Sequence, residues 1–114
     1  MTTFDERERA FERRFAQEEE HRFHARNRRH RLLAIWASER MTLAGQAAEG
    51  YVTSFTECAV VTDDDTLVER LRSDLRTAGI EATPASLRGE MERCAMLARY
   101  ERRFADAPNQ GSTV

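Results

Sequence analysis

The sequence predicts an all-α protein, a four-helix bundle, and three observations support this class. Four segments carry apolar residues at steps of three and four, which is the spacing of one face of a helix. No segment alternates apolar and polar residues for long enough to form a strand. No Gly or Pro occurs before Gly45, so the first helix can be very long.

The first helix is expected to run from Met1 to about Leu43. Thr3 and Glu6 have the spacing of a capping box, and Asp5 adds negative charge where the helix dipole favours it. At about 1.5 Å per residue this helix would be roughly 60 Å long, which exceeds the span of a domain of this size. Part of it must therefore extend beyond the body.

The apolar pattern of this helix shows which part extends. Phe4, Phe11 and Phe15 fall on one narrow line of the helix, and most residues between them are charged. Apolar residues return on that line only at Leu33 and Trp36. The interruption consists of Arg22, Arg26 and Arg29. We therefore expect two separate packing surfaces, one on each half of the helix.

Three shorter helices are expected after a break between Arg40 and Gly45. The second carries an apolar face from Ala47 to Ala59, and the third from Leu67 to Ala78. We expect Asp63, Asp64 and Asp65 to cap the third helix, because they lack the Gly and the later Glu of a calcium loop. Gly79 predicts its end. The fourth helix is expected to start with Thr83 and Pro84 and to reach about Phe104.

The lengths of these helices predict the domain organisation. Helices two to four would each be about 22 to 30 Å long, so they can cover only about twenty residues of the first helix. Residues 1–20 are therefore expected to form an arm that binds a partner, and residues 21–104 a helical bundle. We expect the arm to be frayed in the free protein and helical when bound. Residues 105–114 are expected to form a disordered tail.

Composition and motifs exclude several functions. The net charge of −2 gives no overall field that would attract nucleic acid or an anionic membrane. No membrane span or signal peptide is visible, and Cys58 and Cys94 fit a reducing compartment, so we expect a soluble intracellular protein. No nucleophile, phosphate-loop or dinucleotide motif occurs, so an enzyme is not expected. We expect no cofactor and no metal.

One basic segment has two interpretations. It contains no acidic residue and comprises Arg22, His24, Arg26, Arg28, Arg29, His30 and Arg31. It could grip phosphate, or it could be the solvated face of a core helix whose bases pair with Glu18, Glu19 and Glu20, and we favour the second interpretation. His21 and His24 could share a metal, but no third ligand accompanies them.

Several segments of the sequence resemble a known protein family. The first segment comprises Met1, Thr2, Thr3, Phe4, Asp5, Glu6, Arg7, Glu8, Arg9, Ala10, Phe11, Glu12 and then Phe15. This segment is similar to the zeta subunit family of alphaproteobacteria. Arg28-Arg29, Leu32-Leu33 and Trp36-Ala37 continue the similarity. Later portions match in helix order and at Gly50-Tyr51 and Ala78-Gly79. Members of that family inhibit the F-type ATP synthase.

The resemblance implies a specific mechanism and partner. A four-helix bundle would insert its N-terminal arm into a catalytic αβ interface of the ATPase head, reach the γ shaft and block rotation during hydrolysis. The α, β and γ subunits would be the partners of a free monomer, at the cytoplasmic face of the inner membrane. The implied contact residues are Phe4, Asp5, Arg7, Glu8, Arg9, Ala10, Phe11, Glu12 and Phe15.

Two other functions remain open from the residues alone. A nucleic-acid-binding helical module could use the basic segment from Arg22 to Arg31, and its affinity would fall steeply with salt. A helical adaptor could instead self-associate through the phenylalanine arm.

Overall fold

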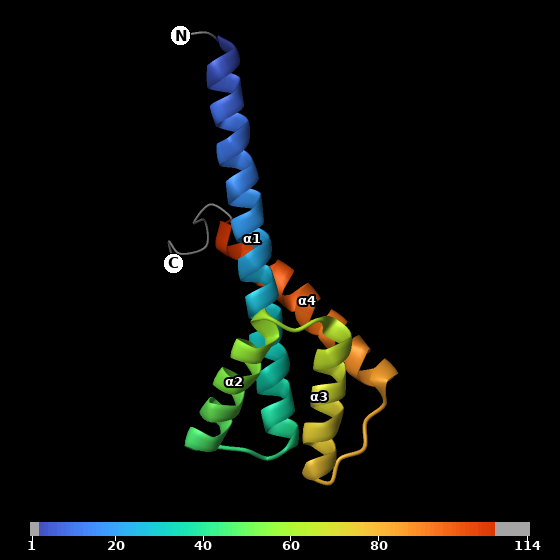
Figure 1. Cartoon of the computed structure of the whole chain (residues 1–114). Coiled ribbons are helices and arrows are strands. Elements are labelled where there is room, and N and C mark those ends of the chain that lie inside the picture. The colour runs from blue at the N-terminus through green and yellow to red at the C-terminus, as the bar shows by residue number, and fades with distance from the viewer. Residues whose placement is uncertain (1–2, 107–114) are drawn as a thin grey trace.

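The computed structural model describes residues 3–106 and confirms the all-α class. It contains four helices, which are α1 (Thr3–Arg40), α2 (Gly45–Val60), α3 (Asp64–Thr77) and α4 (Pro84–Asp106) (Figure 1). The long first helix that the sequence predicted is α1, with 38 residues. Thr3 lies inside α1, so it is not the residue that caps the helix.

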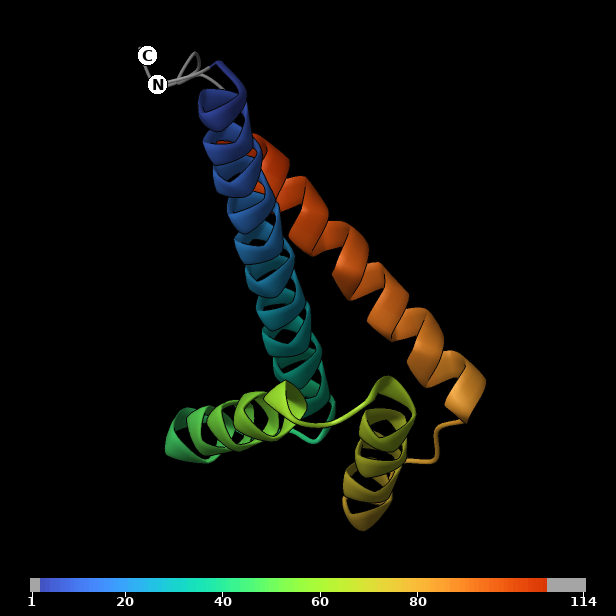
Figure 2. The same cartoon turned by 45° about the horizontal axis from the view of Figure 1, so that its top comes forward.

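The helix α1 is the element that the other three share. Figures 1 and 2 show α2, α3 and α4 gathered around its C-terminal half, while its N-terminal half extends past them. In Figure 2, α4 runs obliquely beside α1, and α2 and α3 diverge from each other. The result is an elongated molecule of 64 × 40 × 26 Å. We call residues 3–20 the arm and the remaining described residues the body.

The hydrophobic core lies entirely in the body. Each helix contributes residues at helical spacing, and their side chains are at most 6% exposed. The core residues are Leu33, Ala34, Ala37, Val52, Phe55, Ala59, Leu67, Val68, Leu71, Leu75, Leu87, Met91 and Cys94. No arm residue belongs to this set, which supports the two packing surfaces that the sequence predicted.

The helix α1 ends earlier than expected, at Arg40 instead of about Leu43. Thr42 has a φ of 61°, in the left-handed region that β-branched residues rarely adopt. Its amide donates to the carbonyl of Glu39, and the Leu43 amide donates to that of Ser38 at 2.9 Å. This is a Schellman closure with Thr in the position where Gly is usual. The sequence did not predict it because Thr carries no such signal.

The predicted ends of α3 are confirmed. Asp63 is its N-cap, and its Oδ1 accepts the Thr66 amide at 2.8 Å. This hydrogen bond holds the pKa of the Asp63 carboxyl below its usual value. At the other end Gly79 has a φ of 83°, and the Ile80 amide donates to Leu75 at 2.8 Å. The acidic cluster therefore serves as a helix start, as expected.

The start of α4 is also confirmed. The Thr83 hydroxyl accepts the Ser86 amide at 3.1 Å, and Pro84 occupies the first helical position. The helix continues to Asp106, slightly beyond the predicted end at about Phe104. Residues 105 and 106 are thus helical and do not belong to the predicted disordered tail, and the rest of that tail lies outside the described residues.

Candidate functional site

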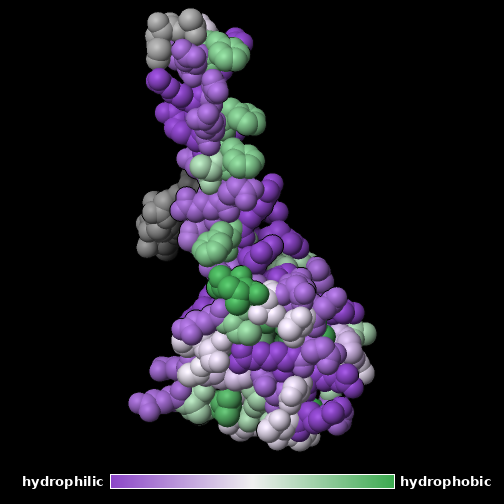
Figure 3. Space-filling model, viewed as in Figure 1, coloured by the Kyte–Doolittle hydropathy of each residue, from purple (hydrophilic) through white to green (hydrophobic). Residues whose placement is uncertain are grey.

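The arm presents three phenylalanines to solvent. Phe4, Phe11 and Phe15 are 72%, 69% and 56% exposed. At 100° per residue the three side chains lie within about 40° of one another around the helix axis. Figure 3 shows hydrophobic side chains projecting along the arm between hydrophilic ones. The line that the sequence predicted is therefore present and uncovered.

The structure brings all the predicted contact residues together on the arm. Besides the phenylalanines, Ala10 and Asp5 are half-buried and the charged residues are exposed, namely Arg7, Glu8, Arg9 and Glu12. By helix geometry Glu8 flanks the phenylalanine line on one side and Arg7 on the other. Together these residues surround the helix, so a partner that contacts all of them must enclose it.

The arm is helical from Thr3 onward in the structure. This is the conformation that we expect for the bound arm. The expected fraying of the free arm stays a prediction, which amide hydrogen exchange would measure. In the free protein the arm phenylalanines are exposed, so little tertiary packing stabilises the helical conformation of the arm. Most of the stability of helices in proteins comes from such packing.

The basic segment is largely occupied by ion pairs within the chain. Arg22 pairs with Glu19 at 2.8 Å, as the favoured interpretation expected. Two further arginines instead reach other helices, because Arg28 contacts Glu101 and Arg29 contacts Asp64. These partners differ from Glu18, Glu19 and Glu20, which the sequence predicts as the partners. Arg28 and Arg29 thus have structural partners, which disfavours the hypothesis that this segment binds nucleic acid.

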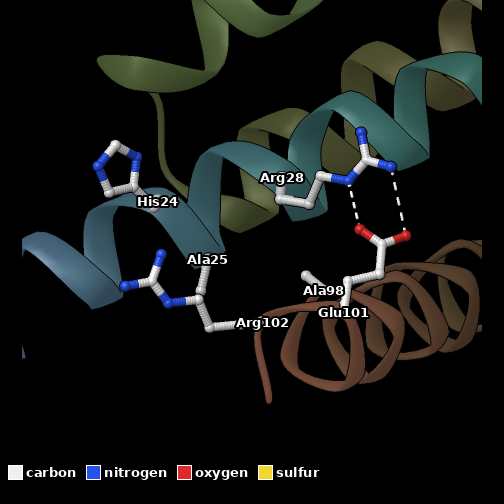
Figure 4. A pocket seen from close by; sticks show the side chains of 6 residues that line it. All are labelled: His24, Ala25, Arg28, Ala98, Glu101 and Arg102. Carbon is white, nitrogen blue, oxygen red and sulfur yellow. Dashed lines mark hydrogen bonds and ion pairs between the residues drawn. The ribbon is translucent and has the colours of Figure 1, made fainter. Parts of the chain in front are cut away.

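Arg28 and Glu101 join α1 to α4 close to the base of the arm. Figure 4 shows the two side chains pointing toward each other, with Nε and Nη2 of Arg28 donating to the two carboxylate oxygens at 2.6 and 3.2 Å. The pair raises the pKa of Arg28 and lowers that of Glu101. It borders a hollow of about 210 Å³, lined by His24, Ala25, Arg28, Ala98, Glu101 and Arg102.

His30 is not part of a solvated basic face, which corrects the sequence interpretation. Its side chain is 2% exposed, and its Nε2 lies 2.8 Å from Nη2 of Arg29. The same Arg29 nitrogen donates to Oδ1 of Asp64 at 2.8 Å. Burial, and then the neighbouring Arg29 charge, lower the pKa of His30 to about 4. His30 is therefore neutral near pH 7 and accepts the hydrogen bond from Arg29.

Comparison with known proteins supports what the arm suggests. The sequence model of the family described as ATPase inhibitor subunit zeta matches residues 1–101, which include the arm and nearly all of the body. The chain belongs to this zeta family. Searches of curated proteins and of solved structures give no match.

Membership of the zeta family confirms the resemblance and gives the general function. An ATPase inhibitor subunit is regulatory and not catalytic. It interacts with the ATP synthase. Within residues 3–106, no helix is long and apolar enough to cross a membrane.

No metal site is evident in the described part of this zeta-family chain. Residues 3–106 contain no cluster of three or more His, Cys, Asp or Glu side chains that could hold a metal ion. Cys58 and Cys94 are both free thiols. Cys94 is buried in the core, and burial raises its pKa. Cys58 is half-buried, and a hydrogen bond with Thr62 lowers its pKa.

Several large apolar residues outside the arm of this zeta-family chain are exposed, and the sequence did not indicate them. Phe23, Val60 and Val61 are 53%, 57% and 85% exposed. Phe23 was overlooked because it lies off the line of the arm phenylalanines. The sequence predicts Val60 and Val61 only as the end of a helix that leads into a turn. The available signal was two adjacent valines immediately before the polar residues Thr62 and Asp63.

Proposed function

We propose that the protein inhibits ATP hydrolysis by inserting its arm into a catalytic αβ interface of the ATP synthase head. The arm would reach the γ shaft there and act as a pawl against rotation in the hydrolytic direction. Phe4, Phe11 and Phe15 are the anchors of this contact. The flanking contact residues are Asp5, Arg7, Glu8, Arg9, Ala10 and Glu12. The family supplies the ATPase as partner, and the shape of the chain favours the arm as effector.

The observation that carries this proposal is the uncovered phenylalanine line. Monomeric proteins seldom leave large apolar side chains exposed in a row unless they bind something. Phe11 is 69% exposed although Phe55, in the body, is fully buried. Within the described residues no body helix covers the three phenylalanines, and α4 borders α1 at His24 and Ala25, beyond the end of the arm.

Dimensions also favour insertion of the arm alone. From Phe4 to Ala25 the helix rises by about 30 Å, enough to enter a deep interface. The molecule is 40 × 26 Å across its two shorter axes, whereas a single helix is only about 10 to 12 Å wide. The body would therefore stay outside and brace the arm.

The energetics fit reversible inhibition. Burying three phenylalanines contributes about 5 to 9 kcal/mol before costs. Ordering a frayed segment on binding costs about 2 to 5 kcal/mol. The difference supports a specific contact that the enzyme can still release.

Removal of residues 1–18 tests the proposal. The core lies entirely outside this segment, so the truncated protein is expected to melt cooperatively near the temperature of the full chain. It should no longer inhibit ATP hydrolysis or retain the α and β subunits in a pull-down from membranes. A truncated protein that folds and inhibits as well as the full chain would exclude the arm as effector.

A further inference from the structure

Three apolar side chains remain exposed where the arm meets the body. They are Phe23 of α1 and Val60 and Val61 at the end of α2, with 53%, 57% and 85% of their surface exposed. We call these three residues the junction patch. None of them belongs to the hydrophobic core.

The contacts around the α2–α3 connection place this patch on one side of α1. The ion pair between Arg29 and Asp64 holds the start of α3 against α1. Beside it, His30 and Arg26 line a hollow together with Thr62, Asp63, Asp64 and Asp65. At 100° per residue, Phe23 points within about 20° of His30, about two turns closer to the arm. Phe23 therefore lies on the same side of α1 as the connection that follows Val60 and Val61.

The patch lies near the end of the apolar surface of the arm, and Phe23 is turned by about 80° from Phe15 around the helix axis. Figure 3 shows hydrophobic side chains along the visible face of the arm and again where the arm joins the body. Phe15 and Phe23 are eight residues apart, which is about 12 Å along the helix. The register between them is fixed, because α1 is one uninterrupted helix without Gly or Pro. A partner that encloses the arm up to Phe15 thus has its outer surface close to the patch.

The fold does not require apolar residues at these positions. Val61 follows the last residue of α2 and is almost fully exposed, so a polar residue would serve the turn equally well. Its neighbours Thr62 and Asp63 are polar, as is usual for such a connection. Clustered exposed apolar side chains of this kind mark interaction surfaces.

We propose that the junction patch is a second contact with the ATPase head, made against apolar residues at the rim of the site that receives the arm. This inference rests on the proposed function, since it takes the arm to be inserted in that head. The arm supplies the anchor, and the patch sets how deeply the arm enters. Depth matters because a rigid helix carries any change at the rim directly to Phe4 at its far end.

The variant Val61→Asp in the full-length protein tests the patch. The side chain is exposed in the free protein, so the melting temperature should stay unchanged. Burying a charge against an apolar rim is unfavourable, so half-inhibition of ATP hydrolysis should need ~10-fold more protein. Ala47→Asp is the matched control, because Ala47 is exposed near the opposite end of α2. It should inhibit like the unmodified protein.

Comparison with Phe11→Ala separates this inference from the proposed function. If Phe11→Ala weakens inhibition and Val61→Asp does not, the arm acts without the patch and the inference is wrong. If neither variant weakens inhibition, both the inference and the proposed function fail. If Val61→Asp instead abolishes self-association seen by sedimentation while inhibition is unchanged, the patch joins two copies of this chain, which also overturns the inference.

A second measurement does not depend on loss of activity. A photo-crosslinking amino acid at position 61 should form a covalent adduct with a subunit of the purified ATPase head. The same group at position 47 should not. Crosslinking at neither position, with inhibition intact, would show that the body stays clear of the head. Phe23→Ser should weaken inhibition in the same way as Val61→Asp.

Discussion

The two halves of α1 place apolar side chains in opposite environments. Leu33, in the half that belongs to the body, is fully buried beneath the other helices, while Phe11 in the arm is 69% exposed. Both belong to one helix with continuous backbone hydrogen bonding, so secondary structure does not account for the difference. What differs is the reach of the neighbouring helices. An apolar stripe becomes core where a second helix covers it, and remains a binding surface where none does.

This contrast predicts that body residues control folding and arm residues control binding. Substitutions in each half should therefore change different measurements. The following experiments are ordered from the largest expected effect to the smallest.

Replacing Leu71 by Asp should have the largest effect. Leu71 is fully buried in the core, so the new carboxylate would have to be buried without a partner or else unfold the body. We expect a loss of more than ~4 kcal/mol of folding free energy, measured by urea unfolding. Leu71→Ala serves as a control that leaves a cavity and should cost about 2 to 5 kcal/mol. A Leu71→Asp protein with unchanged stability would show that the body is packed differently.

Acid should weaken the body through His30. The pKa of His30 is about 4 in the fold and about 6.5 when unfolded, so the neutral form is favoured by folding. The resulting stability is fully present above pH 6.5 and is lost as the pH falls toward 4. The loss should reach up to about 3 kcal/mol.

The variant His30→Gln isolates this contribution. Gln does not titrate, so its stability should fall less between pH 6.5 and 4 than that of the unmodified protein. The acid responses of Asp63 and Glu101, whose pKa values are lowered in the fold, are common to both proteins and cancel in the comparison. Parallel pH profiles of the two proteins would contradict the assigned role of His30.

Replacing Phe11 by Ala should affect binding alone. The side chain is exposed in the free protein, so the melting temperature should hardly change. Inhibition should weaken by roughly 1.5 to 3 kcal/mol, or about one to two decades in affinity, because a large apolar contact is lost. Phe55→Ala is the matched control in the core and should cost about 3 to 5 kcal/mol of stability. A Phe11→Ala protein that melts much earlier would place Phe11 in the core.

Replacing Thr42 by Gly should give the smallest effect, and a favourable one. Thr42 has a φ of 61°, which Gly adopts without steric cost. Relief of this strain, less the greater backbone entropy of Gly in the unfolded chain, should raise stability by up to about 1 kcal/mol. Inhibition should not change, because this turn lies at the end of α1 opposite the arm. A destabilised Thr42→Gly protein would show that the Thr side chain makes a compensating contact.

Local physics let the sequence determine the class, both ends of α3, the start of α4 and the line of arm phenylalanines. The Asp63 cap, the Gly79 stop and the start at Thr83 and Pro84 each depend on residues within one turn of each other, so their pattern is readable along the chain. The phenylalanine line is likewise a matter of helix spacing. The nine contact residues are implied by the family resemblance, and all of them belong to the arm.

Tertiary structure decided the features that depend on which helices meet. Arg28 and Glu101 are separated by 73 positions in the sequence, and Arg29 and Asp64 by 35. No local sequence pattern indicates which acidic residue each arginine contacts. His30 resembles its basic neighbours in sequence, and the packing of the body buries its side chain. The junction patch has the same origin. Phe23 belongs to α1, and Val60 and Val61 lie at the end of α2, and helix spacing within a single element cannot reveal a surface that two elements share.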